Sequence, residues 1–160
     1  MIQRLTRHLA RDPERLRSGA LAGFVAAIAF AVWMKLDMRI TGDRVDDFQL
    51  LGGIGPFSDD WQITGASIHH ANGALLGAGY TSVEPLLRGP GWLRGITFAL
   101  VENTLLWPIV LLLDRIHPDI RSGELPSYNR RWPFIAETIR HIVFGAVLGY
   151  CFERLNRRTS

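Results

Sequence analysis

Charged residues are segregated along this 160-residue chain into the segments that connect its apolar stretches. Four stretches, residues 18–34, 61–83, 95–113 and 132–152, make up half of the chain but hold only three of its 33 Asp, Glu, Lys and Arg residues. A surface helix of a soluble protein carries a polar face along its whole length, so this distribution excludes an ordinary soluble fold. A helix that crosses the hydrocarbon core of a bilayer, about 30 Å thick, needs about 20 apolar residues. The sequence therefore predicts an all-α membrane protein with four transmembrane helices.

The predicted organisation is a single transmembrane domain over residues 18–153, between basic tails at residues 1–17 and 154–160. For the first tail, a short interfacial helix and a solvated segment are both open. Asp12 followed by Pro13 is typical of a helix start, so the first helix is predicted to begin there. The four spans are expected near residues 18–36, 61–83, 92–113 and 132–153.

The distribution of Lys and Arg predicts the orientation of the spans, because these residues are retained in excess on the cytoplasmic side. The N-terminal tail, the loop after the second span and the C-terminal tail together hold ten of them, and the two other loops hold seven. We therefore expect both termini in the cytoplasm and an apolar run, residues 48–54 of the first loop, on the outer membrane surface. The formal net charge of +3 follows this topology and does not indicate nucleic-acid binding. The expected partners are the lipid bilayer and either a further copy of the chain or a larger membrane complex.

The second half of the chain resembles the first half at a shift of 72 residues. In two windows this shift superimposes ten identical residues, among them His69 on His141. Because each unit contains two spans, the units share one orientation, and we expect two helical hairpins related by a pseudo-two-fold axis along the membrane normal. Each span also contains a G-x-x-x-G motif, whose small residues let helix backbones approach closely in lipid. These packing residues are Gly19, Gly23, Gly73, Gly77, Gly91, Gly95, Gly145 and Gly149.

Ionisable side chains on three of the predicted spans lie at similar depth. At 1.5 Å per residue from the span ends, His69, Glu102 and His141 are each roughly 12 to 14 Å into the membrane, close to its midplane. An ionisable group at this depth costs at least about 2.5–3.5 kcal/mol, so each is expected to be paired. Arg140 is expected to pair with Glu137, three residues away, or with Glu102. Glu102 has a second alternative, which is a hydrogen bond to a histidine.

Several hypotheses for this cluster stay open. We favour a non-enzymatic membrane protein, related to transport or stress, whose cluster binds or relays protons or a cation. One alternative is a haem- or metal-binding redox subunit, with His69 and His141 as the two axial haem ligands. Another is a polar core that only fixes helix register, in a structural or assembly partner of a larger membrane complex. No catalytic residue is identified, since Cys151 has no base near it in the sequence. The candidate ligands for a divalent metal are His69, His70, Glu102, Glu137 and His141.

A set of short motifs adds a family resemblance over about residues 18–152. The chain resembles the YagU-like family of small four-helix bacterial inner-membrane proteins and their uncharacterised relatives. This resemblance implies a location in the bacterial inner (cytoplasmic) membrane and a part in acid or stress tolerance, but it supplies no catalytic or ligand-binding residues. The matching residues are Asp47-Phe48 with Leu51-Gly52, His69-His70-x-Asn72-Gly73 with Tyr80, Gly95 with Glu102-Asn103, Leu106-Trp107-Pro108, His117-Pro118, and Arg140-His141 with Phe144, Gly145 and Gly149.

Overall fold

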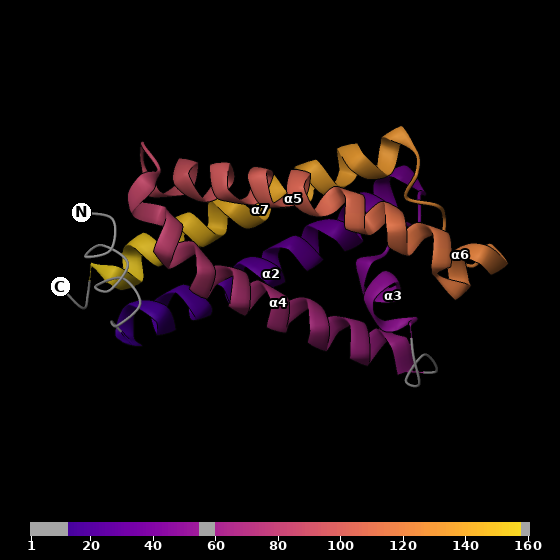
Figure 1. Ribbon diagram of the computed structural model, residues 1–160, viewed down its shortest axis with the longest axis horizontal. Coiled ribbons are helices and arrows are strands. Elements are labelled where there is room, and N and C mark those ends of the chain that lie inside the picture. The colour runs from indigo at the N-terminus through magenta and orange to yellow at the C-terminus, as the bar shows by residue number, and fades with distance from the viewer. Residues whose placement is uncertain (1–12, 55–59, 158–160) are drawn as a thin grey trace.

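The computed structural model describes residues 13–54 and 60–157, and within these ranges the regular structure is entirely helical. The predictions for residues 1–12 and 158–160 fall outside the described residues. Three short helices, α3 (Asp47–Gly52), η2 (Glu84–Leu86) and α6 (Pro118–Ser122), lie between the long ones. The four long helices are α2 (Pro13–Thr41), α4 (Trp61–Val83), α5 (Gly91–Ile116) and α7 (Arg131–Asn156) (Figure 1). The predicted all-helical fold is therefore confirmed.

Three of the long helices are long and apolar enough to cross a membrane: α2, α5 and α7. These helices fit the predicted membrane protein. The fourth, α4, coincides with the predicted second span and has 23 residues, but it is not one of the three. Its apolar residues are interrupted by His69, His70 and Asn72, which lower its hydropathy.

The long helices pack as two pairs, α2 with α4 and α5 with α7, and the pairs are joined where α2 packs on α7. Small residues permit the close approach within each pair. A Cβ atom added to Gly23 would overlap the backbone of Gly73 and Gly77, and one added to Gly95 would overlap the backbone of Gly145 and Gly149. Each seam is therefore formed by glycines that the G-x-x-x-G pattern singles out.

The central core lies where α2 crosses α7. Ala22, Ala26, Phe30 and Met34 of α2 present a buried face at a spacing of four residues, as expected for one side of a helix. This face packs against side chains of α7 that include Leu148. α2 also continues past the predicted end of the first span to Thr41, which places residues of the expected loop on a helix.

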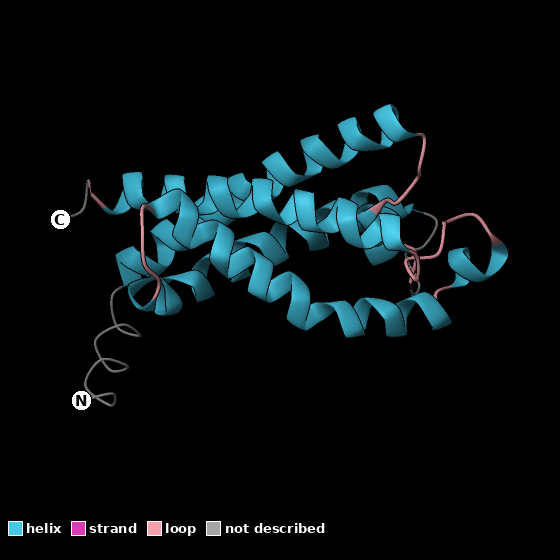
Figure 2. Ribbon diagram, turned by 90° about the horizontal axis from the view of Figure 1, so that it is seen from above, coloured by secondary structure: helices cyan, strands magenta, loops and turns pink. Residues whose placement is uncertain are grey.

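The two outer helices, α4 and α5, make few contacts with each other in the part of the chain that the structure describes. They converge at the η2 turn and diverge toward α3, as Figure 1 shows, and Figure 2 shows the same helices from above. At the converging end, the buried Glu84 carboxylate forms ion pairs with Arg15, at 2.7 Å, and with Arg94. These ion pairs connect η2 to both α2 and α5, and they leave the space between α4 and α5 open toward the other end.

Helix α3 lies across the diverging ends of α4 and α5 (Figure 1). The Asp46 side chain caps it by accepting a hydrogen bond from Phe48 N, and its backbone approaches α4 so closely that Gly52 and Gly65 have no room for a Cβ atom. The first part of the run expected on the membrane surface is thus a helix packed on α4. Beside it, Val45, Leu50, Leu125 and Tyr128 form a second small core.

Candidate functional site

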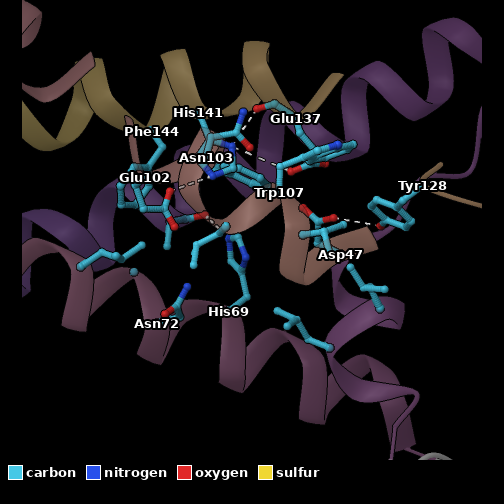
Figure 3. Close-up of a pocket in the computed structure, with 18 residues that line it drawn as sticks. Asp47, His69, Asn72, Glu102, Asn103, Trp107, Tyr128, Glu137, His141 and Phe144 are labelled. Atoms are coloured by element: carbon cyan, nitrogen blue, oxygen red, sulfur yellow. Dashed lines mark hydrogen bonds and ion pairs between the residues drawn. The ribbon is translucent and has the colours of Figure 1, made fainter. Parts of the chain in front are cut away.

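A cavity of about 160 Å³ lies between the diverging parts of α4 and α5. α2 and α7 form its inner wall, and α3 covers its wider end (Figure 3). The titratable lining residues are Asp47, His69, Glu102, Glu137 and His141, with Tyr128 beside α3. Among the described residues, no Lys or Arg lines the cavity. The structure therefore gathers four of the five residues that the sequence analysis names as candidate metal ligands around one space.

Glu102 of α5 and His141 of α7 face each other in this cavity (Figure 3). Glu102 Oε2 lies 3.2 Å from His141 Nε2, and both side chains are largely buried. The other ring nitrogen, His141 Nδ1, lies 2.7 Å from the backbone carbonyl oxygen of Glu137. Because a carbonyl oxygen only accepts hydrogen bonds, Nδ1 must carry a hydrogen. The expected alternative in which Glu102 is bonded to a histidine corresponds to this contact.

The two contacts of His141 determine where the Glu102–His141 pair can carry hydrogen. A neutral imidazole has one N–H group, and here Nδ1 carries it. Nε2 would then be an acceptor facing a carboxylate oxygen, and two acceptors repel each other. A proton on Nε2 or on Oε2 would remove this repulsion. The arrangement is chemically suited to taking up and releasing one proton.

Arg140 of α7 is the centre of a second group of ion pairs, which shares Glu137 with the surroundings of His141. Its guanidinium is fully buried and donates from Nε and Nη2 to the two carboxylate oxygens of Asp37, each at 2.7 Å. It also donates to Glu137 Oε1 at 2.6 Å and to the Val45 carbonyl oxygen at 3.0 Å. Its Nη1 lies 3.7 Å from Asp47 Oδ2. Of the two partners that the sequence analysis weighs for Arg140, the structure gives it Glu137 and not Glu102.

The Asp47 carboxylate connects this cluster to the small core beside α3. Tyr128, which is almost fully buried, donates its hydroxyl hydrogen to Asp47 Oδ1 at 3.0 Å. Burial, reinforced by the negative charge of Asp47, holds the pKa of the Tyr128 phenol well above its ordinary value, so Tyr128 remains a hydrogen-bond donor at neutral pH. Figure 3 shows this pair at the α3 end of the cavity.

The two histidines of α4 have different positions. His69 lines the cavity, and its Nε2 donates to the Ala27 carbonyl oxygen of α2 at 3.2 Å. His70 lies outside the cavity lining, and its Nδ1 donates to the Ala66 carbonyl oxygen of its own helix at 2.6 Å. His70 packs against Phe24 and Phe48, so it is not brought together with the carboxylates.

The arrangement of His69 and His141 does not fit a haem with two axial histidines. The Phe30 ring packs against both imidazoles, with centroids at 4.9 Å from His69 and 5.3 Å from His141. The Nε2 atom of each ring is directed at an oxygen, Ala27 O or Glu102 Oε2. A flat macrocycle would have to replace the Phe30 side chain and both of these contacts.

A divalent metal also lacks a ready set of ligands. Protein zinc sites use at least three side-chain ligands at about 2 Å from the metal. Within residues 13–54 and 60–157, no group of three or more His, Cys, Asp or Glu side chains is placed to hold a metal ion. Four of the five candidate ligands share the cavity, but Glu137 is turned toward Arg140 and His69 toward α2.

Sequence reasoning missed the partners of Arg140 other than Glu137. Asp37 is separated from Arg140 by 103 residues, and its position suggested a loop next to the first span. Asp47 and Tyr128 are further partners in the cluster that the spacing along α7 does not reveal. A signal was nevertheless present, because a guanidinium near the midplane needs more than one carboxylate or carbonyl oxygen to satisfy its donors.

Comparison with known proteins gives one family match. Searches of curated proteins and of solved structures give no match to this chain. Residues 13–160 match a family described as a family of unknown function, DUF6789. This match does not name the YagU-like family that the short motifs resemble. The match covers all the described helices. On this match, the chain belongs to the DUF6789 family of unknown function.

Proposed function

We propose that this protein binds and relays protons inside the membrane, in a transport- or stress-related role, and that the Glu102–His141 pair is its proton-binding site. The observation that carries the proposal is the pair of contacts at His141. Its Nδ1 donates to Glu137 O at 2.7 Å, so a proton on Nε2 or on Glu102 Oε2 would remove the repulsion between these two atoms at 3.2 Å. An ionisable pair buried among membrane helices is a functional site by default.

A line of polar groups gives this proton a direction of transfer. From His141, the Glu137 carboxylate lies toward the α3 end, with Oε2 at 3.9 Å from Nδ1. Beyond it, Arg140 contacts Asp47, and Asp47 accepts the Tyr128 hydroxyl hydrogen. We propose that protons exchange between the Glu102–His141 pair and this end of the protein. The cavity has room for the several water molecules that such an exchange needs.

The proposal includes a topology of four spans with both termini in the cytoplasm of a bacterium, in its inner membrane. The lengths of the helices support α4 as the fourth span, since 23 residues extend roughly 34 Å, enough for the hydrocarbon core. The position of the polar residues of α4 supports it too. His69 and Asn72 line the cavity, and a membrane helix can carry polar residues on a face that is turned away from lipid. The YagU-like resemblance and the excess of Lys and Arg support the location and the orientation.

We also propose that the two helix pairs are copies of one hairpin. Each pair has a glycine seam at equivalent positions of the 72-residue shift: Gly23 against Gly73, and Gly95 against Gly145. The shift also relates His69 to His141, and both line the same cavity. His141 faces a carboxylate from the other helix of its pair, Glu102 of α5, whereas His69 faces the Ala27 carbonyl oxygen of α2. The proposed proton site therefore belongs to the second helix pair.

Infrared spectroscopy of the purified protein during a pH titration tests the proton site. In protein labelled with ¹³C-glutamate, one band of Glu102 should change with pH in the wild type: either the stretch of a protonated carboxyl group or the carboxylate stretch beside a protonated His141. That change should be lost in Glu102→Gln and retained in the control Glu124→Gln, since Glu124 is an exposed loop residue outside the cavity. An unchanged signal in Glu102→Gln would place the proton elsewhere and overturn the proposal.

A further inference from the structure

The cavity between α4 and α5 has three acidic lining residues, and the partner of one of them, Glu102, is a histidine and not an arginine. Within residues 13–54 and 60–157, its charged lining residues are Asp47, Glu102 and Glu137, without a Lys or Arg. Arg140 stands behind the lining, where it binds Asp37 and Glu137 and lies 3.7 Å from Asp47. The Glu102 carboxylate has His141 as its partner and no basic residue. Inside a membrane this excess of carboxylates favours a cation in the cavity.

The polar atoms that remain available are mainly hydrogen-bond acceptors. Beside its 3.2 Å contact with His141 Nε2, the buried Glu102 Oε2 has no further partner among the described residues, so it can accept a hydrogen bond. Asn103 is 5% exposed, and in the described part of the chain its only hydrogen bond is donated by Nδ2 to Thr138, which leaves its carbonyl oxygen unpaired. His69 donates from Nε2 to Ala27 O, so Nδ1 holds a free lone pair. A ligand for these atoms must donate hydrogen bonds.

The remaining lining is apolar and aromatic. Phe30, Leu76, Trp107 and Phe144 surround the polar atoms, and aromatic faces attract organic cations. The volume of about 160 Å³ admits a small molecule. A divalent metal is a poor fit, because no set of three ligands is assembled among residues 13–54 and 60–157. The cavity is therefore suited to a ligand that has one positively charged group with several N–H donors and an apolar remainder.

From these three observations we infer that the cavity binds a small organic ammonium ion, with Glu102 as its counter-ion and Asn103 as a hydrogen-bond acceptor. The inference rests on the proposed function, because the cation would take the place of the proton held at Glu102 and His141. Binding of one ammonium ion then releases one proton, and the charge of the cavity is conserved. The groups that face Glu102 across the cavity are His141 and Glu137 from α7, His69 from α4 and Asp47 from α3, whereas α2 contributes the uncharged Ala27 and Phe30.

Calorimetric titration of the detergent-solubilised full chain with n-butylammonium tests the inference. The neutral analogue 1-butanol and the anion butyrate serve as ligand controls with the same apolar body. We expect saturable binding of n-butylammonium only. In two buffers of different ionisation enthalpy, the heats should report about one proton released per cation bound. Binding of 1-butanol with the same affinity, or binding without proton release, would overturn the inference.

Two variants and one control locate the binding site. Glu102→Gln should weaken n-butylammonium binding at least about tenfold, whereas the exposed control Glu124→Gln should bind as the wild type does. Asn103→Leu should weaken binding without abolishing the infrared proton signal of Glu102, which keeps the test valid if Glu102→Gln folds poorly. Unchanged affinity in both cavity variants would contradict the inference.

The failures of the two proposals are distinguishable. A wild-type protein that shows the Glu102 infrared signal but no heat of n-butylammonium binding would retain the proton site and overturn the ammonium site. A protein that binds n-butylammonium through Glu102 with no pH-dependent carboxyl signal would overturn both the proton site and the exchange of proton for cation.

Discussion

Glu102 on α5 and His141 on α7 meet at 3.2 Å inside a cavity whose described lining contains no Lys or Arg. The contact joins two neighbouring membrane helices at a point where a carboxylate alone would be costly to bury. His141 is in turn held by the Glu137 carbonyl oxygen, so its ring presents Nε2 to the cavity. This geometry separates a titratable pair from the permanent ion cluster around Arg140, and the two are expected to respond differently to substitution.

Removal of the Arg140 charge should be strongly destabilising. Arg140→Met would leave the Asp37 and Glu137 carboxylates buried without their partner, which costs about 3–5 kcal/mol for a buried pair. Arg140→Lys keeps the charge but not the two-pronged contact with Asp37, so its loss should be smaller. Thermal unfolding in detergent measures both. The control is Arg39→Ala, at an exposed position of α2, with an expected change within about 0.5 kcal/mol; equal losses in all three variants would contradict the ion cluster.

Tyr128 should make stability depend on alkaline pH. Its pKa is raised in the folded protein by burial and by Asp47, so the unfolded chain ionises first, at a pKa of about 10. The stabilisation is complete below that pH and is lost as the pH rises toward the folded pKa. Tyr128→Phe should lower stability at neutral pH by about 1.5–3 kcal/mol, the range for a hydrogen bond to a charged group, and should flatten the alkaline decline. Tyr150→Phe, at an exposed position of α7, should leave the decline unchanged in the same unfolding series.

The glycine seam between α5 and α7 should tolerate no methyl group. In Gly95→Ala the new Cβ would overlap the backbone of Gly145 and Gly149, so the two helices must separate, at a cost of about 1–3 kcal/mol. Gly79→Ala is the matched control on α4, since nothing lies within 4 Å of its added Cβ, and its higher helix propensity should leave stability equal or greater. Equal melting temperatures for the two variants would show that the seam is not closely packed in solution.

The proposed topology predicts which loops can be reached from outside the cell. In a Cys151→Ser background, a cysteine at Glu124 should react with a membrane-impermeant maleimide added to intact cells. A cysteine at Arg88 should react only after the membrane is opened, because it lies on the proposed cytoplasmic side. Both positions are exposed in the structure, so a lack of reaction reports the membrane barrier. The reverse pattern would require the opposite orientation.

The helices could be predicted from sequence because charge and apolar residues are so sharply separated. α2 lies over the predicted first span, and the Glu137–Arg140 contact follows from a spacing of three residues on one helix. His69, Glu102 and His141 were placed at one depth from their distances to the span ends, and all three line the cavity.

Long-range partners could not be predicted in the same way. Asp37 and Asp47 belong to a segment whose acidic residues suggest a solvated loop, yet α2 extends through Asp37, and Asp47 begins a helix packed on α4. The buried guanidinium of Arg140 supplies the reason, because its several donors draw acceptors from α2 and from the chain that follows it. Which histidine would meet Glu102 also depends on how the helix pairs are joined, and the hydropathy pattern contains no information on that.

The most direct test of the proton site is ¹⁵N NMR of the histidine side chains over a pH titration, with His141 assigned by its loss in His141→Gln. The account predicts that Nδ1 of His141 carries a hydrogen throughout, because it donates to Glu137 O. The signal of Nε2 should change with pH in the wild type, and this change should be shifted or lost in Glu102→Gln. An Nδ1 without hydrogen, or an Nε2 titration identical in the wild type and in Glu102→Gln, would contradict the shared proton.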